Sequence, residues 1–195
     1  DEAYLSRMPK GTSRPRLTVQ DQQNGVRVHI PYYTENPEPD QVQCALAWYT
    51  GAFADRERQL GVEILLDALL GTNQSLLEQK LGADIDIGFD DSTLQPTLEL
   101  VLRGATAETA PKFAAGVKQA VTDLLAGGIP EELLLASLNA MEFASLERPG
   151  SLPDGVLDAI YAATGWLHTG DPALLLHTDK LFASLREKLS TGWFN

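Results

Sequence analysis

The sequence predicts an α+β domain in which helices pack on one face of a largely antiparallel sheet. In the first half of the chain apolar residues alternate with polar ones, as in strands with one buried face, whereas later they recur at helical spacing. Strands thus cluster early and helices late, an order typical of α+β domains. The 195 residues suffice for one such domain. We expect residues 1–24 to be a flexible lead-in and residues 25–195 to form a single domain.

Four segments are predicted to be strands of one sheet. They are Val26 to Ile30, Gln41 to Trp48, Asp84 to Asp90, and Leu94 to Arg103, and in each of them apolar side chains occupy alternate positions. Pro96 interrupts the fourth segment early, which predicts a sheet edge or a bulge there. The third and fourth segments are joined so closely that we expect them to pair as a hairpin.

Caps and breakers indicate where two earlier helices begin and end. Asp55 is a plausible N-cap for a helix that stops at Gly71. Ser75 and Glu78 can form a capping box for a shorter helix that ends near Gly82. The apolar positions of the first helix are Leu60, Ile64, Leu65 and Ala68. We expect this helix to pack on the sheet.

The rest of the chain, from Thr106 onward, is predicted to be mostly helical. Gly127 and Gly128 end one helix, Pro130 opens the next, and Asp171 with Pro172 behind it caps the last. The apolar stripes are Phe113, Val117, Val121 and Leu124; then Leu134, Leu138 and Met141; then Val156, Ile160 and Tyr161; and finally Leu175, Phe182, Leu185 and Leu189. The helix that contains Phe113 is expected to cover the sheet together with the helix that contains Leu60.

The net charge of −12 narrows the range of binding partners. Phosphate groups are bound by clustered Lys and Arg, so the excess of 27 acidic over 15 basic residues excludes nucleic acid and disfavours an anionic membrane surface. Two interpretations stay open. The charge either serves solubility or provides a surface for cationic ligands.

Cysteine usage and hydropathy add further limits. Cys44 is the only cysteine, so neither an intrachain disulfide nor a cysteine metal cluster can form, and its place in an alternating run indicates a small buried hydrophobe. No stretch approaches the roughly 18 apolar residues of a transmembrane helix, and no signal peptide opens the chain. The cytoplasm is favoured, although the compartment stays open.

Motifs of zinc hydrolases are absent from the sequence. A zinc peptidase needs metal ligands in a fixed geometry and a Glu that activates water, which H-x-x-E-H or H-E-x-x-H supplies compactly. None of His29, His168 and His177 lies in either motif. We therefore assign no catalytic, cofactor-binding or metal-binding residue, and expect structural or solvated roles for the three histidines.

Other chemistries find no better support. There is no G-x-S-x-G elbow, and Gly127 and Gly128 end a helix rather than open a phosphate loop. The acidic set Asp84, Asp86, Asp90 and Asp91 lacks the spacing of an EF-hand loop. Its alternation with apolar residues predicts the solvated face of a strand.

Four stretches nevertheless resemble the insulinase/pitrilysin superfamily of zinc peptidases. Leu69 to Gly82 (LLGTNQSLLEQKLG) is similar to the segment where a helix ends on small residues and a short helix leads to Leu-Gly. Leu98 to Gly104 (LELVLRG) resembles the strand that follows it, and Gly127 to Glu132 (GGIPEE) the turn between two long helices. Most specific is Trp166 to Pro172 (WLHTGDP), followed by Leu175, which is similar to the second domain of presequence proteases. The resemblance covers about residues 25 to 195.

The resemblance implies an insulinase-type half-domain of a peptidase whose paired homologous halves enclose a chamber. In such enzymes the first half bears the zinc motif and the second lacks it, so zinc is expected in the first domain of the parent and no family catalytic residue transfers to this chain. The implied partners are the other domains of the same peptidase and peptide substrates. The family domain usually continues further, which makes Asn195 a candidate truncation point.

Two alternatives accompany this interpretation. One is a purely structural homologue of the peptidase fold in a larger complex. The other is an independent enzyme that uses an unrecognised acidic site.

Overall fold

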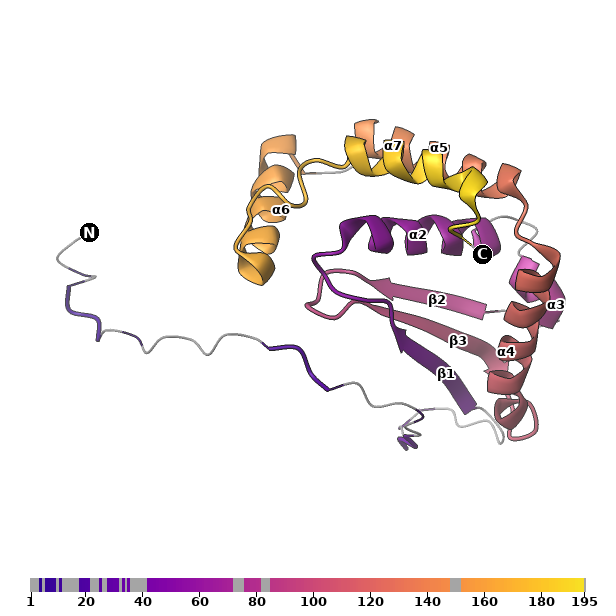
Figure 1. Cartoon of the computed structure of the whole chain (residues 1–195). Helices are drawn as coiled ribbons and strands as arrows, with labels where there is room; N and C mark the ends of the chain where they lie inside the picture. Colours follow the sequence, from indigo (N-terminus) through magenta and orange to yellow (C-terminus); the bar gives the residue numbers. More distant parts are fainter. Residues whose placement is uncertain are drawn as a thin grey trace.

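The structure is a computed structural model of the whole chain. It describes residues 42–71, 76–81, 85–147 and 152–194, together with residues 4, 6–9, 11, 18–21, 25, 28–31, 33 and 35. A three-stranded sheet and a set of helices make up the described part, which confirms the α+β class with helices on one face of an antiparallel sheet (Figure 1).

The sheet has the order β1-β3-β2. Its strands are β1 (Val42–Tyr49), β2 (Ile85–Asp90) and β3 (Thr97–Ala105), and β3 pairs antiparallel with both neighbours. The predicted hairpin is confirmed, and Pro96 lies immediately before β3 rather than within it. The register places Leu46 of β1 and Ile87 of β2 opposite Leu100 of β3. A register shift near Val42 makes the beginning of β1 irregular.

The first predicted strand is wrong in its described part. Val28 and Ile30 belong to no strand and are 70% and 73% exposed, while Val26 lies outside the described residues. An alternating pattern indicates which side chains could share a face, but a strand also needs a neighbour to pair with. Among the described residues, β1 pairs only with β3.

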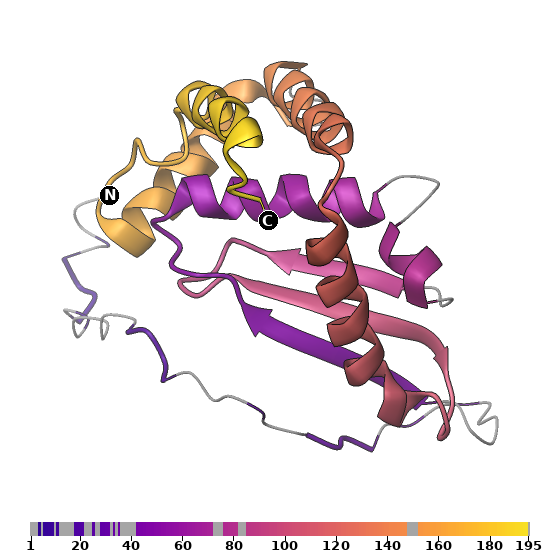
Figure 2. The same cartoon turned by 45° about the vertical axis from the view of Figure 1, so that its right-hand side comes forward.

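One core lies between the sheet and α4 (Ala110–Gly127). Figure 2 shows α4 crossing in front of the sheet. Phe113, Val117, Ala120 and Leu124 of this helix are buried against Ile85, Leu100, Leu102 and Ala105. Ala120 takes the place that the sequence suggested for Val121, which is 40% exposed, because positions 113, 117, 120 and 124 follow the helical period more closely.

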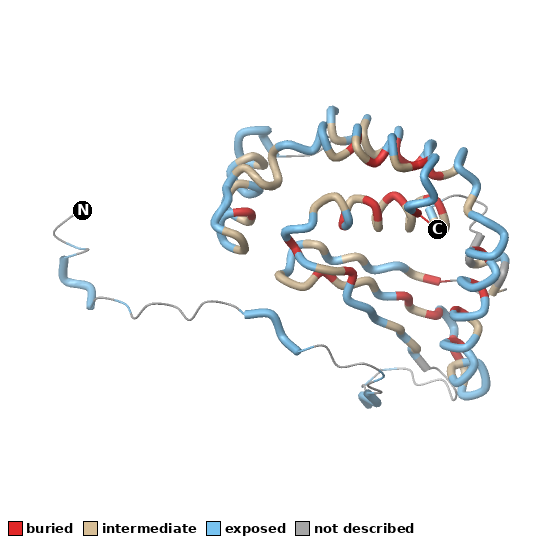
Figure 3. Tube along the Cα trace, in the orientation of Figure 1, coloured by how far each residue is buried: buried red, intermediate tan, exposed pale blue. Residues whose placement is uncertain are grey.

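A second core lies among the helices α2 (Arg56–Leu70), α5 (Glu131–Glu147) and α7 (Asp179–Lys188). In Figure 1, α2 lies between the sheet and the layer formed by α5 and α7. Its buried members are Ile64, Ala68, Leu134, Leu138, Phe182, Leu185, Leu189 and Phe194. Most of the red stretches of Figure 3 lie in the elements that form these two cores. Leu69 and Leu70 at the end of α2 pack on the sheet core, so α2 joins the two.

The caps that were predicted for α2 are present. The Asp55 side chain accepts a hydrogen bond from the Arg58 backbone N–H, and Gly71 ends the helix with its N–H donated to the Asp67 carbonyl. The short helix α3 (Leu76–Leu81) follows. Ser75, one partner of the predicted capping box, lies outside the described residues. The Glu78 carboxylate accepts from the Ile85 backbone N–H at 3.1 Å and so fixes the start of β2.

The last predicted helix begins later than expected. Gly170, with a φ of 84°, ends α6 (Asp154–Thr169), and the Asp171 side chain then accepts the Ala173 N–H in a turn instead of capping a helix. Regular helix resumes only at α7, whose first turn bonds to the Thr178 carbonyl and which η1 (Leu189–Thr191) follows. The residues between them form turns, and Leu175 is half-buried there.

Candidate functional site

A groove of about 810 Å³ lies between α2, α5, α6 and the turns that precede α7. The loop between β2 and β3 borders it as well, through Asp91 and Ser92. Most of its lining is apolar and includes Phe53, Leu60, Met141, Leu152, Leu157, Ile160, Leu174, Leu175, Leu176, Leu181 and Phe182. A concave, largely apolar site with few polar groups is the usual form of a ligand or partner site.

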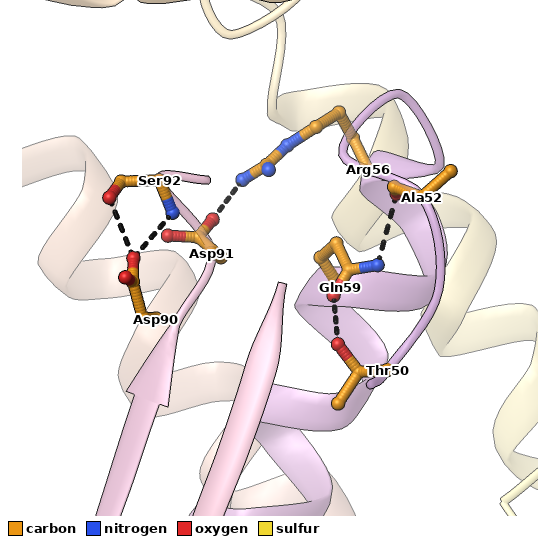
Figure 4. A network of polar contacts seen from close by, with 7 residues as sticks. All are labelled: Thr50, Ala52, Arg56, Gln59, Asp90, Asp91 and Ser92. Atoms are coloured by element: carbon orange, nitrogen blue, oxygen red, sulfur yellow. Dashed lines mark hydrogen bonds and ion pairs between the residues drawn. The ribbon is translucent and has the colours of Figure 1, made fainter. Parts of the chain in front are cut away.

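Three charged side chains stand in this apolar surrounding. Arg56 and Glu63 are seven residues apart on α2, two turns of the helix, so they lie on the same side of it. The Arg56 Nη2 atom donates to the Asp91 carboxylate from the loop between β2 and β3, as Figure 4 shows. The Arg56 guanidinium also lies over the ring of Phe53, at 5.1 Å from the ring centre. Arg56 thus joins α2 to the sheet at the edge of the groove.

The Glu63 carboxyl group has a strongly perturbed pKa. Burial in the apolar wall disfavours its charged form, the nearby negative charge of Asp91 adds to the effect, and Arg56 opposes it; together they raise the pKa of Glu63 to about 7. Close to neutral pH this carboxyl is therefore divided between its protonated and ionised forms. Carboxyl groups perturbed in this way cluster at functional sites.

Hydrogen bonds between the end of β1 and the start of α2 hold this corner of the groove. Gln59 is fully buried; its Oε1 atom accepts from the Thr50 hydroxyl at 2.8 Å and its Nε2 donates to the Ala52 carbonyl at 3.1 Å (Figure 4). The backbone N–H groups of Thr50 and Phe53 donate to the carbonyls of Pro96 and Leu94. Phe53 is 1% exposed, and its fixed ring is the surface over which the Arg56 guanidinium lies.

The three histidines take no common part in this groove. His29 and His177 are exposed, whereas the His168 ring of α6 lies 4.5 Å from the Phe53 ring, centre to centre. Within the described ranges, the His168 Nδ1 and Arg56 Nη1 atoms are buried without a hydrogen-bond partner. No group of three or more His, Cys, Asp or Glu side chains in that part of the chain is arranged to hold a metal ion.

The structure separates the members of the acidic set. Asp84 lies outside the described residues. Asp86 forms an ion pair with Arg103 on the exposed side of the hairpin, and that hydrogen bond lowers the pKa of Asp86. Asp90 accepts from the Ser92 hydroxyl and N–H at 2.6 and 2.9 Å, which lowers its pKa too. Of the three members that the structure describes, only Asp91 joins the groove.

The sequence reasoning missed Arg56 and Glu63. A signal was present, because Glu63 directly precedes Ile64 and follows Leu60 by three residues, so a carboxylate falls on the apolar side of a helix. Cys44 agrees with its interpretation as a small hydrophobe: it is half-buried against the sheet core and its thiol points to the Ala110 carbonyl at 3.7 Å. None of the described helices has both the length and the apolar character needed to cross a membrane.

The chain is similar to parts of several much longer proteins. It is 27% identical over 156 residues to Protein HypA of Clostridium perfringens, which covers 77% of this chain and 16% of that protein. It is 26% identical over 171 residues to the mitochondrial presequence protease of Danio rerio, and this match covers 83% of this chain and 16% of that protein. Presequence protease 1, chloroplastic/mitochondrial, of Arabidopsis thaliana is 30% identical over 125 residues, and this match covers 60% of this chain and 12% of that protein.

No family model matches the chain. The matched part of the chain spans only 12–16% of the length of the relatives above. The similarities to presequence proteases nevertheless cover most of the chain and recur in animals, fungi and a plant at 23–30% identity. They link the chain, as a distant relative, to the insulinase-like peptidases, and indicate a peptidase-related domain.

Proposed function

We propose that this chain is a non-catalytic part of a longer zinc metalloendopeptidase that degrades peptides, in which it helps to enclose the substrate. One observation carries the proposal: the chain aligns along most of its length with 11–17% of the length of the presequence proteases that it matches, yet its sequence contains neither H-x-x-E-H nor H-E-x-x-H. Zinc would be held by another domain of the longer protein. Residues 25–195 would then be one insulinase-type half-domain, with residues 1–24 leading into it.

The packing of the chain supports a structural role. One core lies between α4 and the sheet and the other among α2, α5 and α7, and the charged side chains at the groove are two carboxyl groups and one arginine. Carboxyl groups alone could act as general acids or bases. Glu63, however, is paired with no nucleophile and no metal-ligand set among the described residues.

The proposal is tested with the natural longer protein and with the 195-residue chain side by side. A fluorogenic peptide is offered to both, with and without a chelator, and zinc is measured after dialysis. We expect chelator-sensitive cleavage and stoichiometric zinc in the longer protein only. Chelator-sensitive turnover by the 195-residue chain would contradict the proposal, as would a longer protein that cleaves no peptide in the presence of zinc.

A further inference from the structure

Helix α6 carries an apolar side that the described chain leaves largely uncovered. Gly165 is the one residue of α6 that is buried, while Val156, Ile160 and Tyr161 are 44%, 47% and 43% exposed. Leu157, Ile160 and Tyr161 line the groove, and Leu60, Met141 and Phe182 line it from α2, α5 and α7. Figure 1 shows α6 standing apart from the layer of α5 and α7. Two apolar walls therefore face a space that no described segment fills.

Further apolar side chains of the same helices are exposed outside the groove lining. Phe143 and Leu146 of α5 are 60% and 77% exposed, and Trp166 and Leu167 of α6 are 67% and 70% exposed. Exposed apolar side chains that gather in one place mark contacts with other protein segments, and the partly exposed apolar lining of the groove is such a surface. Because permanent interfaces are the more hydrophobic ones, this surface fits a lasting contact within one protein better than transient binding.

The charges in the groove define one further property of the occupant. Glu63 and Asp91 are two carboxyl groups, and Arg56 is the single cation beside them, already joined to Asp91. An ionised Glu63 in this apolar wall lacks a full counter-charge. A cation delivered by the occupant would supply it, and an ion pair of this kind strengthens as water is excluded.

We propose that the groove receives an amphipathic helix from another part of the same longer protein, with its apolar stripe against α6 and a lysine or arginine beside Glu63. The proposal rests on the proposed function, because it requires further domains. Helices form the walls on three sides, and an apolar helix face laid into a groove between helices is a common mode of recognition. The negative charge of the groove fixes the register of the docked helix, since a basic residue placed away from Glu63 would be buried without a partner.

Accessibility of the groove tests the proposal directly. Ala144 lines it on α5, whereas Ala115 is exposed on α4, away from the groove lining. In a Cys44→Ala background, Ala144→Cys and Ala115→Cys are each labelled with a maleimide in the 195-residue chain and in the longer protein. We expect labelling of the groove thiol to slow by at least about tenfold in the longer protein. Equal rates at Ala144→Cys in both proteins would overturn the proposal.

Glu63→Gln tests the charge, because it is expected to act in opposite directions in the two proteins. In the 195-residue chain it removes a desolvated carboxylate, so it should leave the fold intact and no less stable. In the longer protein it removes the partner of the docked cation, so labelling of Ala144→Cys should speed up severalfold at pH 8. Labelling of Ala115→Cys should not change.

Unchanged or slower groove labelling in the Glu63→Gln longer protein would show that no basic residue docks there, and the proposal would be wrong. None of these readouts depends on peptide cleavage. A longer protein that shields its groove but cleaves no peptide would refute the proposed function and keep this proposal, and the reverse result would refute only this proposal.

Discussion

Helices α4 and α6 have similar lengths and comparable apolar content, yet they lie in different surroundings. Helix α4 buries Phe113, Val117, Ala120 and Leu124 against the sheet, whereas α6 buries only Gly165 and leaves Ile160 nearly half exposed. An apolar stripe shows that a helix has a side to bury; it does not show that the surface which covers that side belongs to the same stretch of chain. For α4 that surface is the sheet of this chain. For α6, we propose, it lies elsewhere in a longer protein.

The largest expected effect concerns α4. Phe113→Ala removes a side chain that is 5% exposed in the core between α4 and the sheet. We expect a loss of about 3–5 kcal/mol in the free energy of unfolding, because a cavity of this size cannot close fully. Denaturant titration of the 195-residue chain measures it. A loss below about 1 kcal/mol would mean that α4 is no better packed than α6 and would remove the contrast.

An intermediate effect concerns the pH dependence that Glu63 imposes. Its pKa is raised from 4.5 to about 7 in the folded chain, so between these values the folded state binds more protons than the unfolded state. The contribution of Glu63 to the free energy of unfolding is therefore fully present below pH 4.5 and is lost as the pH rises through 7. We expect the free energy of unfolding to fall by roughly 1–3 kcal/mol between pH 5 and pH 8 from this group.

Glu63→Gln is the control for this pH effect, because it keeps the shape of the side chain and cannot ionise. The difference in slope between the two proteins isolates Glu63 from the general repulsion of a chain with a net charge of −12. Identical slopes would mean that the carboxyl group titrates normally and that the groove wall around it is open to water.

The smallest expected effect concerns α6. Ile160→Ala on the groove side of α6 should change the stability of the 195-residue chain by less than about 0.5 kcal/mol, because the side chain is 47% exposed there. In the longer protein the same substitution should cost about 2 kcal/mol or more, as for a buried isoleucine. Equally small costs in the two proteins would indicate that α6 faces solvent in both.

The comparison of the two helices also shows how far sequence patterns lead. Strands β1, β2 and β3, the hairpin and the caps of α2 could be predicted, because each depends on local alternation or on a cap residue such as Asp55. The strand predicted at Val26 to Ile30 failed in its described part, residues 28–30, and the helix start predicted at Asp171 failed too, since pairing partners and tight turns depend on tertiary surroundings.

The groove was harder to predict than the fold. Its charged cluster brings Glu63 and Arg56 from one helix together with Asp91 from a loop about thirty residues away, a proximity that only the folded chain creates. Asp91 was noticed as one of four acidic residues, but nothing local separates it from Asp86, which pairs with Arg103 on the exposed side of the hairpin. The sequence offered one clue to the groove, because Glu63 is a charged residue on the apolar side of a helix.

Amide hydrogen exchange of α4 and α6 tests the central claim most directly, because it reports on both helices at once in unmodified protein. It is measured by mass spectrometry in the 195-residue chain and in the longer natural protein. The account predicts that α4 is strongly protected in both, and that α6 exchanges quickly in the 195-residue chain but becomes protected by at least about tenfold in the longer protein. Equal protection of α6 in the two proteins would contradict the claim that another part of the protein covers it.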